Sequence, residues 1–195
     1  MVHIAAGPIT MPGREHFNAR LAPITEADFE TLARLGEAIW RLHYSKIISM
    51  EQIDYMLSGR YTAEKLRAYL NADDRWLELL WLDRRAVGYC SHAISSAPGE
   101  MKLEQLYLLE ECRGKGLGGL MLRHVETRAR ARACRVLMLT VNKHNADSIA
   151  VYRKSGFAVR EEAVFDIGNG YVMDDYVMEK VLCALTPANL SGSHV

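Results

Sequence analysis

The sequence predicts a single α/β (α+β) domain with a mixed central sheet of about six to seven strands, flanked by about four helices. Three observations support this prediction. The chain has 195 residues, 49% of them hydrophobic, which is enough for one core and short for two. Strand-like and helix-like apolar patterns follow one another from residue 17 to residue 182 without a repeat or a linker. A glycine-rich segment, residues 114–119, joins a strand pattern to a helix pattern.

The domain is therefore predicted to span residues 17–182. Residues 1–16 and 183–195 are rich in small, polar and helix-breaking residues. We expect both segments to be flexible extensions that lie outside the packed domain.

The first part of the domain predicts one short strand followed by three helices. The strand precedes Thr25, which has the character of a helix N-cap, with Asp28 three residues later as in a capping box. The long helix that follows places its apolar residues on one face, namely Phe29, Leu32, Gly36, Ile39 and Trp40. Ser49 and Gln52 repeat the capping-box spacing and open a second helix, and residues 61–70 predict a third.

The middle of the chain predicts an antiparallel meander that leads into a helix. Residues 75–109 form apolar and aromatic runs that are broken at 83–85 and at 96–99, which indicates three successive strands. After the glycines, apolar residues recur at helical spacing from Leu117 to about Arg132.

The last part of the chain predicts a buried strand, a helix and a closing hairpin. Residues 135–141 are too short and too rich in strand formers to be a helix. Asn145 then opens a helix that ends at Lys154 or Ser155, with Gly156 suited to the left-handed cap position. Two strand patterns flank the turn "GNG" at 168–170 and predict a hairpin.

Charge and cysteine usage exclude several classes of protein. Lysine plus arginine equal aspartate plus glutamate, 24 each, so no overall field favours nucleic acid, and the run "RARARACR" is interpreted as a solvated helix face. The four cysteines and the histidines His43, His92, His124 and His144 show no metal-ligand spacing, so we expect no metal. With no apolar run near ~20 residues and no signal-peptide pattern, we expect a cytoplasmic protein that binds no membrane.

The glycines at 114–119 predict an anion site, because consecutive N–H groups at a helix start can surround a diphosphate. A Walker A loop is excluded by spacing, since no Ser or Thr follows Lys115. The segment satisfies the dinucleotide pattern GxGxxG, but the next strand ends in Thr140, Val141 and Asn142 without the required acidic residue. Glycines that only permit a tight turn remain the structural alternative.

The loop also resembles that of the GCN5-related N-acetyltransferase superfamily, of small bacterial type. The family pattern [RQ]-x-x-G-x-[GA] is met by Arg113, Gly116 and Gly118. It is accompanied in the family's order by the preceding meander strand, the segment "VNKHNADSIAVYRKSGF" and the terminal "YVMEK" strand. The resemblance covers about residues 17–182. It implies a sheet splayed between its fourth and fifth strands and acetyl-CoA as co-substrate.

The resemblance also assigns the residues that bind the coenzyme. The pantetheine arm is expected between the strands at 101–109 and 135–141, with the backbone N–H of Leu108 near the thioester carbonyl, where one donor can contribute ~3 kcal/mol. The predicted contacts with the coenzyme are Leu106, Leu108, Arg113, Gly114, Lys115, Gly116, Leu117, Gly118, Gly119, Asn142, Asn145 and Tyr152. Asn145 is equally well explained as a plain helix N-cap, a role that is compatible with binding.

Two residues are predicted to carry catalysis. A primary amine has a pKa of about 10.4, so only about one molecule in a thousand is nucleophilic at neutral pH and a base is needed. Glu104 is the first candidate, directly or through water; its alternative is an exposed strand carboxylate. Tyr152 matches the family tyrosine near the coenzyme sulfur, and its alternative is a core aromatic. Carboxylates that attract a cationic acceptor are sought among Glu51, Asp54, Asp174 and Asp175.

The function predicted from the resemblance is transfer of an acetyl group to a primary amine of a small molecule or protein, by direct attack in a ternary complex. The alternative is a non-catalytic sensor that binds acetyl-CoA or CoA. The resemblance places acceptor contacts at 39–70 and in the final hairpin loop, and family habit favours a homodimer.

Overall fold

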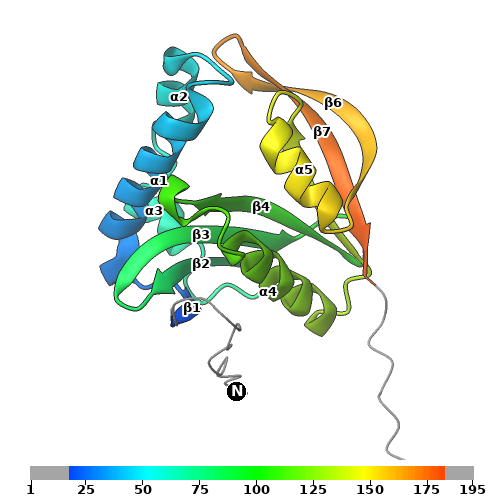
Figure 1. Ribbon diagram of the computed structural model, residues 1–195, viewed down its shortest axis with the longest axis horizontal. Coiled ribbons are helices and arrows are strands. Elements are labelled where there is room, and N and C mark those ends of the chain that lie inside the picture. Colours follow the sequence, from blue (N-terminus) through cyan, green and yellow to red (C-terminus); the bar gives the residue numbers. More distant parts are fainter. Residues whose placement is uncertain (1–17, 183–195) are drawn as a thin grey trace, which may run out of the picture.

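A computed structural model describes residues 18–182, so both predicted terminal extensions lie outside the described residues (Figure 1). Seven strands form one sheet in the order β1-β2-β3-β4-β5-β7-β6. The strands are β1 (Ala19–Pro23), β2 (Arg75–Leu82), β3 (Arg85–Ile94), β4 (Glu100–Leu108), β5 (Val136–Asn142), β6 (Ala158–Gly168) and β7 (Tyr171–Val181). Neighbours run antiparallel except β4 and β5, which are parallel. The predicted mixed sheet is thus confirmed.

Helices cover both faces of this sheet. They are α1 (Phe29–Tyr44), α2 (Met50–Leu57), α3 (Ala63–Arg67), α4 (Leu117–Ala131) and α5 (Ala146–Lys154), with short 3-10 turns at Glu26–Asp28 and Glu110–Cys112. Because side chains alternate along a strand, Leu79 of β2 packs in the core under α1 and α3, whereas Leu80 packs in the core under α4 and α5. The order of strands and helices agrees with the sequence prediction.

Local sequence signals explain most element boundaries. Ser49 accepts a hydrogen bond from the N–H of Gln52 at 3.2 Å and opens α2. Gly156 has a φ of +91° after α5, as its predicted cap position requires. Thr25 forms the predicted capping box with Asp28, but the box opens a 3-10 turn and α1 begins only at Phe29.

The sheet splays open between β4 and β5. The two strands pair only from Glu100 to Leu103 on β4 and from Val136 to Leu139 on β5. Beyond this seam, β4 continues to Leu108 and β5 to Asn142 without pairing to each other. The splay predicted from the family resemblance is therefore confirmed, and it exposes one backbone edge of each strand.

The β6–β7 hairpin and α2 meet on the far side of the splay, as Figure 1 shows at the top of the view. The Gln52 amide donates to the Val172 carbonyl at 3.0 Å, and the Tyr55 hydroxyl donates to the Ile167 carbonyl at 2.7 Å. These bonds hold together the two segments in which acceptor contacts were predicted. Within residues 18–182, no helix is both long enough and apolar enough to cross a membrane.

Candidate active site

The glycine loop and the first turn of α4 form a cradle of backbone donors. Gly114 and Gly116 have φ values of +72° and +80°, a conformation that side chains disfavour. An added Cβ on Gly118 would meet no protein atom within 4 Å, so packing within the chain does not require glycine there. The first N–H groups of a helix lack partners within it, and Gly116 provides no side-chain cap. This cradle fits an anion.

Only the backbone of Leu117 faces this cradle, because its side chain is 8% exposed and packs in the core under α4. Lys115 and Arg113 are exposed on the same loop. The contacts of residues 113–119 with a diphosphate stay a prediction.

The open edge of β4 presents the backbone of Leu106 and Leu108. Leu109 donates its N–H to Val87 on β3 at 2.9 Å. Because successive N–H groups along a strand point to opposite edges, those of Leu106 and Leu108 point toward the edge from which β5 has diverged. This is the position in which an arm could bond to β4 as an added strand.

The opposite wall is formed by the end of β5 and the start of α5. Asn142 is 7% exposed, and its Oδ1 accepts the N–H of His144 at 2.9 Å. Asn145 is 5% exposed and caps α5, with its Oδ1 accepting the N–H of Ser148 at 3.3 Å. The N-cap role of Asn145 is thus present, and its amide nitrogen faces His43 Nε2 at 3.1 Å.

Tyr152 lies on α5 beside a group of tyrosines. The hydroxyls of Tyr44 and Tyr107 are 3.3 Å apart. Burial raises the pKa of the Tyr152 hydroxyl above its usual value of 10, and the nearby Tyr107 hydroxyl raises it further. Tyr152 therefore keeps its proton at neutral pH and can donate a hydrogen bond. Its ring packs in a tilted, edge-on way against Phe157, 5.8 Å between centroids.

Glu104 projects from an irregularity in β4. Leu103 pairs with His92 and Gln105 pairs with Ser91, so the backbone of Glu104 has no residue opposite it in the β3–β4 register. Such a bulge redirects a side chain. The Glu104 carboxylate is exposed and accepts hydrogen bonds from the Tyr69 hydroxyl at 3.2 Å and the Ser91 hydroxyl at 3.4 Å.

The other predicted carboxylates differ in availability. Asp54 is paired with Arg41 at 2.7 Å, and Asp174 with Lys143 at 2.5 Å. Asp175 faces Asn142 across the β5–β7 pairing and is 5% exposed, and its Oδ1 has no hydrogen-bond partner among the described residues. Burial, and then the charge of Asp174, raise the pKa of Asp175 to about 6. Glu51 is exposed at the start of α2.

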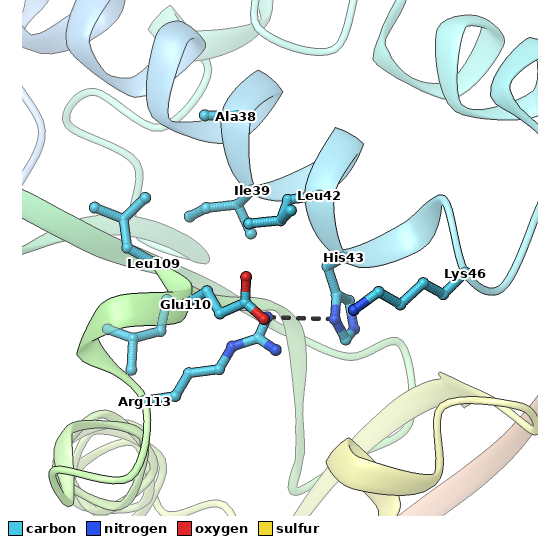
Figure 2. Close-up of a pocket in the computed structure, with 9 residues that line it drawn as sticks. Ala38, Ile39, Leu42, His43, Lys46, Leu109, Glu110 and Arg113 are labelled. Atoms are coloured by element: carbon cyan, nitrogen blue, oxygen red, sulfur yellow. Dashed lines mark hydrogen bonds between the residues drawn. The ribbon is translucent and has the colours of Figure 1, made fainter.

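His43, which the sequence analysis left without a role, bridges the two walls of the splay. A pocket of about 100 Å³ between α1 and the end of β4 is lined by nine residues, including His43, Lys46, Glu110 and Arg113 (Figure 2). Nη2 of Arg113 lies 3.3 Å from His43 Nδ1, and Nδ2 of Asn145 lies 3.1 Å from His43 Nε2. No local sequence signal predicts this contact, because the three residues lie on separate elements.

A second polar cluster lies beneath α4, where side chains of α4 meet those of β2 and β3. Glu78 is 1% exposed; its two carboxylate oxygens lie 2.7 Å from His124 Nε2 and 3.0 Å from Arg128 Nη2. Cys90 and His92, both fully buried, place a ligand-type atom within 4.8 Å of Glu78. Strand pairing, not sequence spacing, creates this group, so the spacing argument did not find it. The expectation that the protein uses no metal stays a prediction.

Comparison with known proteins identifies relatives of this chain. Residues 40–157 match the model of the acetyltransferase (GNAT) family. A spermidine N(1)-acetyltransferase from Thermoplasma acidophilum is 27% identical over 157 residues, 78% of this chain and 91% of the relative. An IAA acetyltransferase from Azospirillum brasilense is 31% identical over 119 residues, 57% of this chain and 75% of the relative.

Solved structures show the same fold. The PaiA N-acetyltransferase of Thermoplasma acidophilum, crystallised with coenzyme A, superposes with a TM-score of 0.70 at 25% identity, covering 84% of this chain and 98% of that one. The ribosomal-protein-S18-alanine N-acetyltransferase of Escherichia coli has a TM-score of 0.60 at 16% identity, covering 89% of this chain and 99% of that one. The second likeness concerns the fold alone.

Proposed function

The chain belongs to the acetyltransferase (GNAT) family, and we propose that it moves the acetyl group of acetyl-CoA to a primary amine by direct attack in a ternary complex. The observation that carries this proposal is that the cradle of backbone donors at 114–119 adjoins the open edge of β4. The diphosphate of the coenzyme binds the loop at 113–119, and its pantetheine arm bonds to the β4 backbone at Leu106 and Leu108. Asn142, Asn145 and Tyr152 contact the arm from the opposite wall.

The chemical step forms a C–N bond and breaks a C–S bond. The amine nitrogen attacks the thioester carbon, and the developing oxyanion accepts a hydrogen bond from the N–H of Leu108. One such donor contributes about 3 kcal/mol to the transition state. The tetrahedral intermediate then collapses with departure of the coenzyme thiolate, and the attacking nitrogen loses its proton to a base.

Glu104 is the base in this proposal. Its carboxylate is exposed at the bulge and is oriented by Tyr69 and Ser91, so a substrate or one intervening water can reach it. Deprotonating an ammonium at neutral pH costs roughly 4 to 5 kcal/mol. A positioned carboxylate lowers this cost because it accepts the proton of the amine as the C–N bond forms.

Tyr152 stabilises the departing thiolate. Because burial raises the pKa of its hydroxyl, full proton transfer to a thiolate is more strongly uphill than the roughly 2 kcal/mol expected from reference pKa values of a phenol and a thiol. A hydrogen bond from the retained proton avoids this cost. The proton that completes the thiol then comes from solvent or from the base.

The acceptor in this proposal is an aliphatic amine, with spermidine as the first compound to test. Two observations support this choice. A relative that aligns over most of the chain is a spermidine N(1)-acetyltransferase. Glu104 on β4 and Asp175 on β7 supply carboxylates on the side of the splay where we propose that the acceptor binds. A carboxylate oxygen that lacks a hydrogen-bond partner among residues 18–182, such as Oδ1 of Asp175, favours a cationic group nearby.

The test has a binding arm and a turnover arm. Acetyl-CoA at 100 times its dissociation constant should stabilise the fold by ~2.7 kcal/mol, with NADH and ATP as controls. Thiol release is then followed with spermidine and a panel of small amines, amino acids and peptide N-termini. Stabilisation by NADH alone would overturn the proposal. Stabilisation by acetyl-CoA with no thiol release for any amine would favour the sensor alternative.

A further inference from the structure

More hydrogen-bond donors face the imidazole of His43 than it has acceptor nitrogens. Arg113 is a donor at any pH near neutrality. The Asn145 side chain is oriented by its cap, because its oxygen accepts the N–H of Ser148, so its nitrogen faces His43. Both ring nitrogens of His43 therefore face donors, at 3.3 Å and 3.1 Å.

A neutral imidazole has one acceptor nitrogen and one N–H. Whichever tautomer His43 adopts, one N–H group points at another N–H group. We call the place where these three side chains meet the mouth of the splay. It holds three donor groups, the N–H groups of Arg113, Asn145 and His43, around one acceptor, the unprotonated ring nitrogen of His43. An incoming oxygen atom that accepts hydrogen bonds would satisfy the donor that is now unmatched.

The charges around His43 favour an anionic or strongly polar acceptor. Lys46 in the turn after α1 and Arg113 on the glycine loop are cations, and both disfavour protonation of the imidazole. Asp147 on α5 acts in the opposite direction, and Glu110 lines the same pocket. Figure 2 shows Lys46, Glu110 and Arg113 grouped around the His43 ring. Burial and the two cations together lower the pKa of His43 below 6.5, so the ring is neutral at pH 7.

We propose that His43 is a coenzyme-binding residue, which donates its N–H to an oxygen of the bound coenzyme and arranges the Arg113 and Asn145 side chains as the two flanking donors. This inference rests on the proposed function, because both flanking residues are predicted coenzyme contacts. The oxygen belongs either to the diphosphate, on the side of Arg113, or to an amide of the pantetheine arm, on the side of Asn145. His43 thereby gives α1 a part in a site that the family resemblance assigned to other elements.

The experiment measures CoA binding by isothermal titration calorimetry, so no amine acceptor is needed. His43→Ala should weaken binding about tenfold, which corresponds to about 1.4 kcal/mol for one hydrogen bond to a charged or polar oxygen. His43→Gln keeps a donor and an acceptor and should recover most of the affinity. His144→Ala is the matched control, because His144 is exposed next to Asn145 and its side chain has no role in the proposal.

The dependence on pH separates binding from simple support of the fold. An imidazolium beside an anion is favoured, so the dissociation constant of the wild type should fall as the pH is lowered through the pKa of His43. His43→Gln cannot titrate and should lose this part of the pH dependence, while the coenzyme's own phosphate ionisation affects both proteins equally. Comparing CoA with pantetheine assigns the oxygen: a loss seen only with CoA indicates the diphosphate, and a loss seen with both indicates the arm.

Three results would overturn the inference. Equal CoA affinity of wild type and His43→Ala, with the wild type binding normally, would remove His43 and leave the proposed function intact. Absence of CoA binding by the folded wild type would overturn the proposed function and this inference together. A loss of affinity in His43→Ala that His43→Gln does not reduce, with unchanged pH dependence, would assign His43 to packing alone.

Discussion

Two places among the described residues combine a histidine with an arginine, and they differ in whether hydrogen-bond donors and acceptors match. Beneath α4, His124 and Arg128 each donate to one oxygen of Glu78, so donors and acceptors match around a carboxylate that is 1% exposed, while the two donor side chains are partly exposed. At the mouth of the splay, His43 meets Arg113 and Asn145 with no carboxylate hydrogen-bonded between them. A matched set of polar groups holds a structure together, whereas a set with surplus donors is suited to a ligand.

The largest expected effect comes from breaking the matched cluster. Glu78→Gln replaces one acceptor oxygen by a donor that faces His124 or Arg128, and should lower the free energy of unfolding by about 3 kcal/mol. Urea unfolding measures this change. Glu26→Gln, in an exposed pair with Arg67, is the control and should change stability by less than about 1 kcal/mol. A loss of CoA affinity without a loss of stability in Glu78→Gln would contradict the view that the Glu78 cluster supports the fold and not the ligand.

Gly118→Ala should separate stability from binding. The added methyl group meets no protein atom within 4 Å and raises helix propensity, so stability should stay unchanged or rise by up to about 1 kcal/mol. The same methyl group projects into open space beside the cradle and should weaken CoA binding about 30-fold, or about 2 kcal/mol. Thermal unfolding and calorimetry measure the two effects. Unchanged CoA affinity would mean that the diphosphate does not approach this part of the helix.

Asp175→Asn should stabilise the free protein. The pKa of Asp175 is raised to about 6 in the folded state from a reference value of 3.8, so its ionised form is disfavoured by folding. The wild type therefore loses stability, relative to the variant, as the pH rises from about 4 to about 6, and the difference stays constant above pH 6. We expect about 2 kcal/mol at pH 7, measured by urea unfolding between pH 4 and pH 8. A difference that is the same at pH 4 and pH 7 would show that ionisation is not its cause.

The smallest expected effect concerns Tyr152→Phe. Removing one hydrogen bond to the leaving thiolate should lower kcat about tenfold, with the KM for acetyl-CoA nearly unchanged. Steady-state thiol release with the best amine of the panel measures both constants. Tyr107→Phe, in the same tyrosine group, provides the comparison. An unchanged kcat in Tyr152→Phe would remove this residue from the mechanism.

The same contrast explains which features could be predicted from the sequence. Signals that act within a few residues were sufficient for the element order: Ser49 and Asn145 cap their helices, and Gly156 adopts the expected left-handed conformation. The glycine loop was found because its pattern is contiguous. Leu106 and Leu108 lie on β4, and Asn142 and Asn145 lie at the end of β5 and the start of α5, while their contacts with the coenzyme stay predictions.

The missed features all depend on contacts between distant segments. His43 was unassigned because its partners are 70 and 102 residues away along the chain. The bulge that frees Glu104 arises from a register shift with β3, which the alternation of apolar residues does not reveal. Glu78, Cys90 and His92 come together through the pairing of β2 with β3. Their roles depend on register and on helix docking, which local propensity does not encode.

The short seam between β4 and β5 divides the sheet into two sets of strands, which we expect to open as two cooperative units. Strands β1 to β4 form one antiparallel set and β5, β7 and β6 form another, joined through four parallel residue pairs. Native-state hydrogen exchange should resolve two groups of protected amides with different opening free energies. A coenzyme that bonds to both sides of the splay would link β4 and β5 where they do not pair with each other. Its binding should therefore bring the two opening free energies closer together.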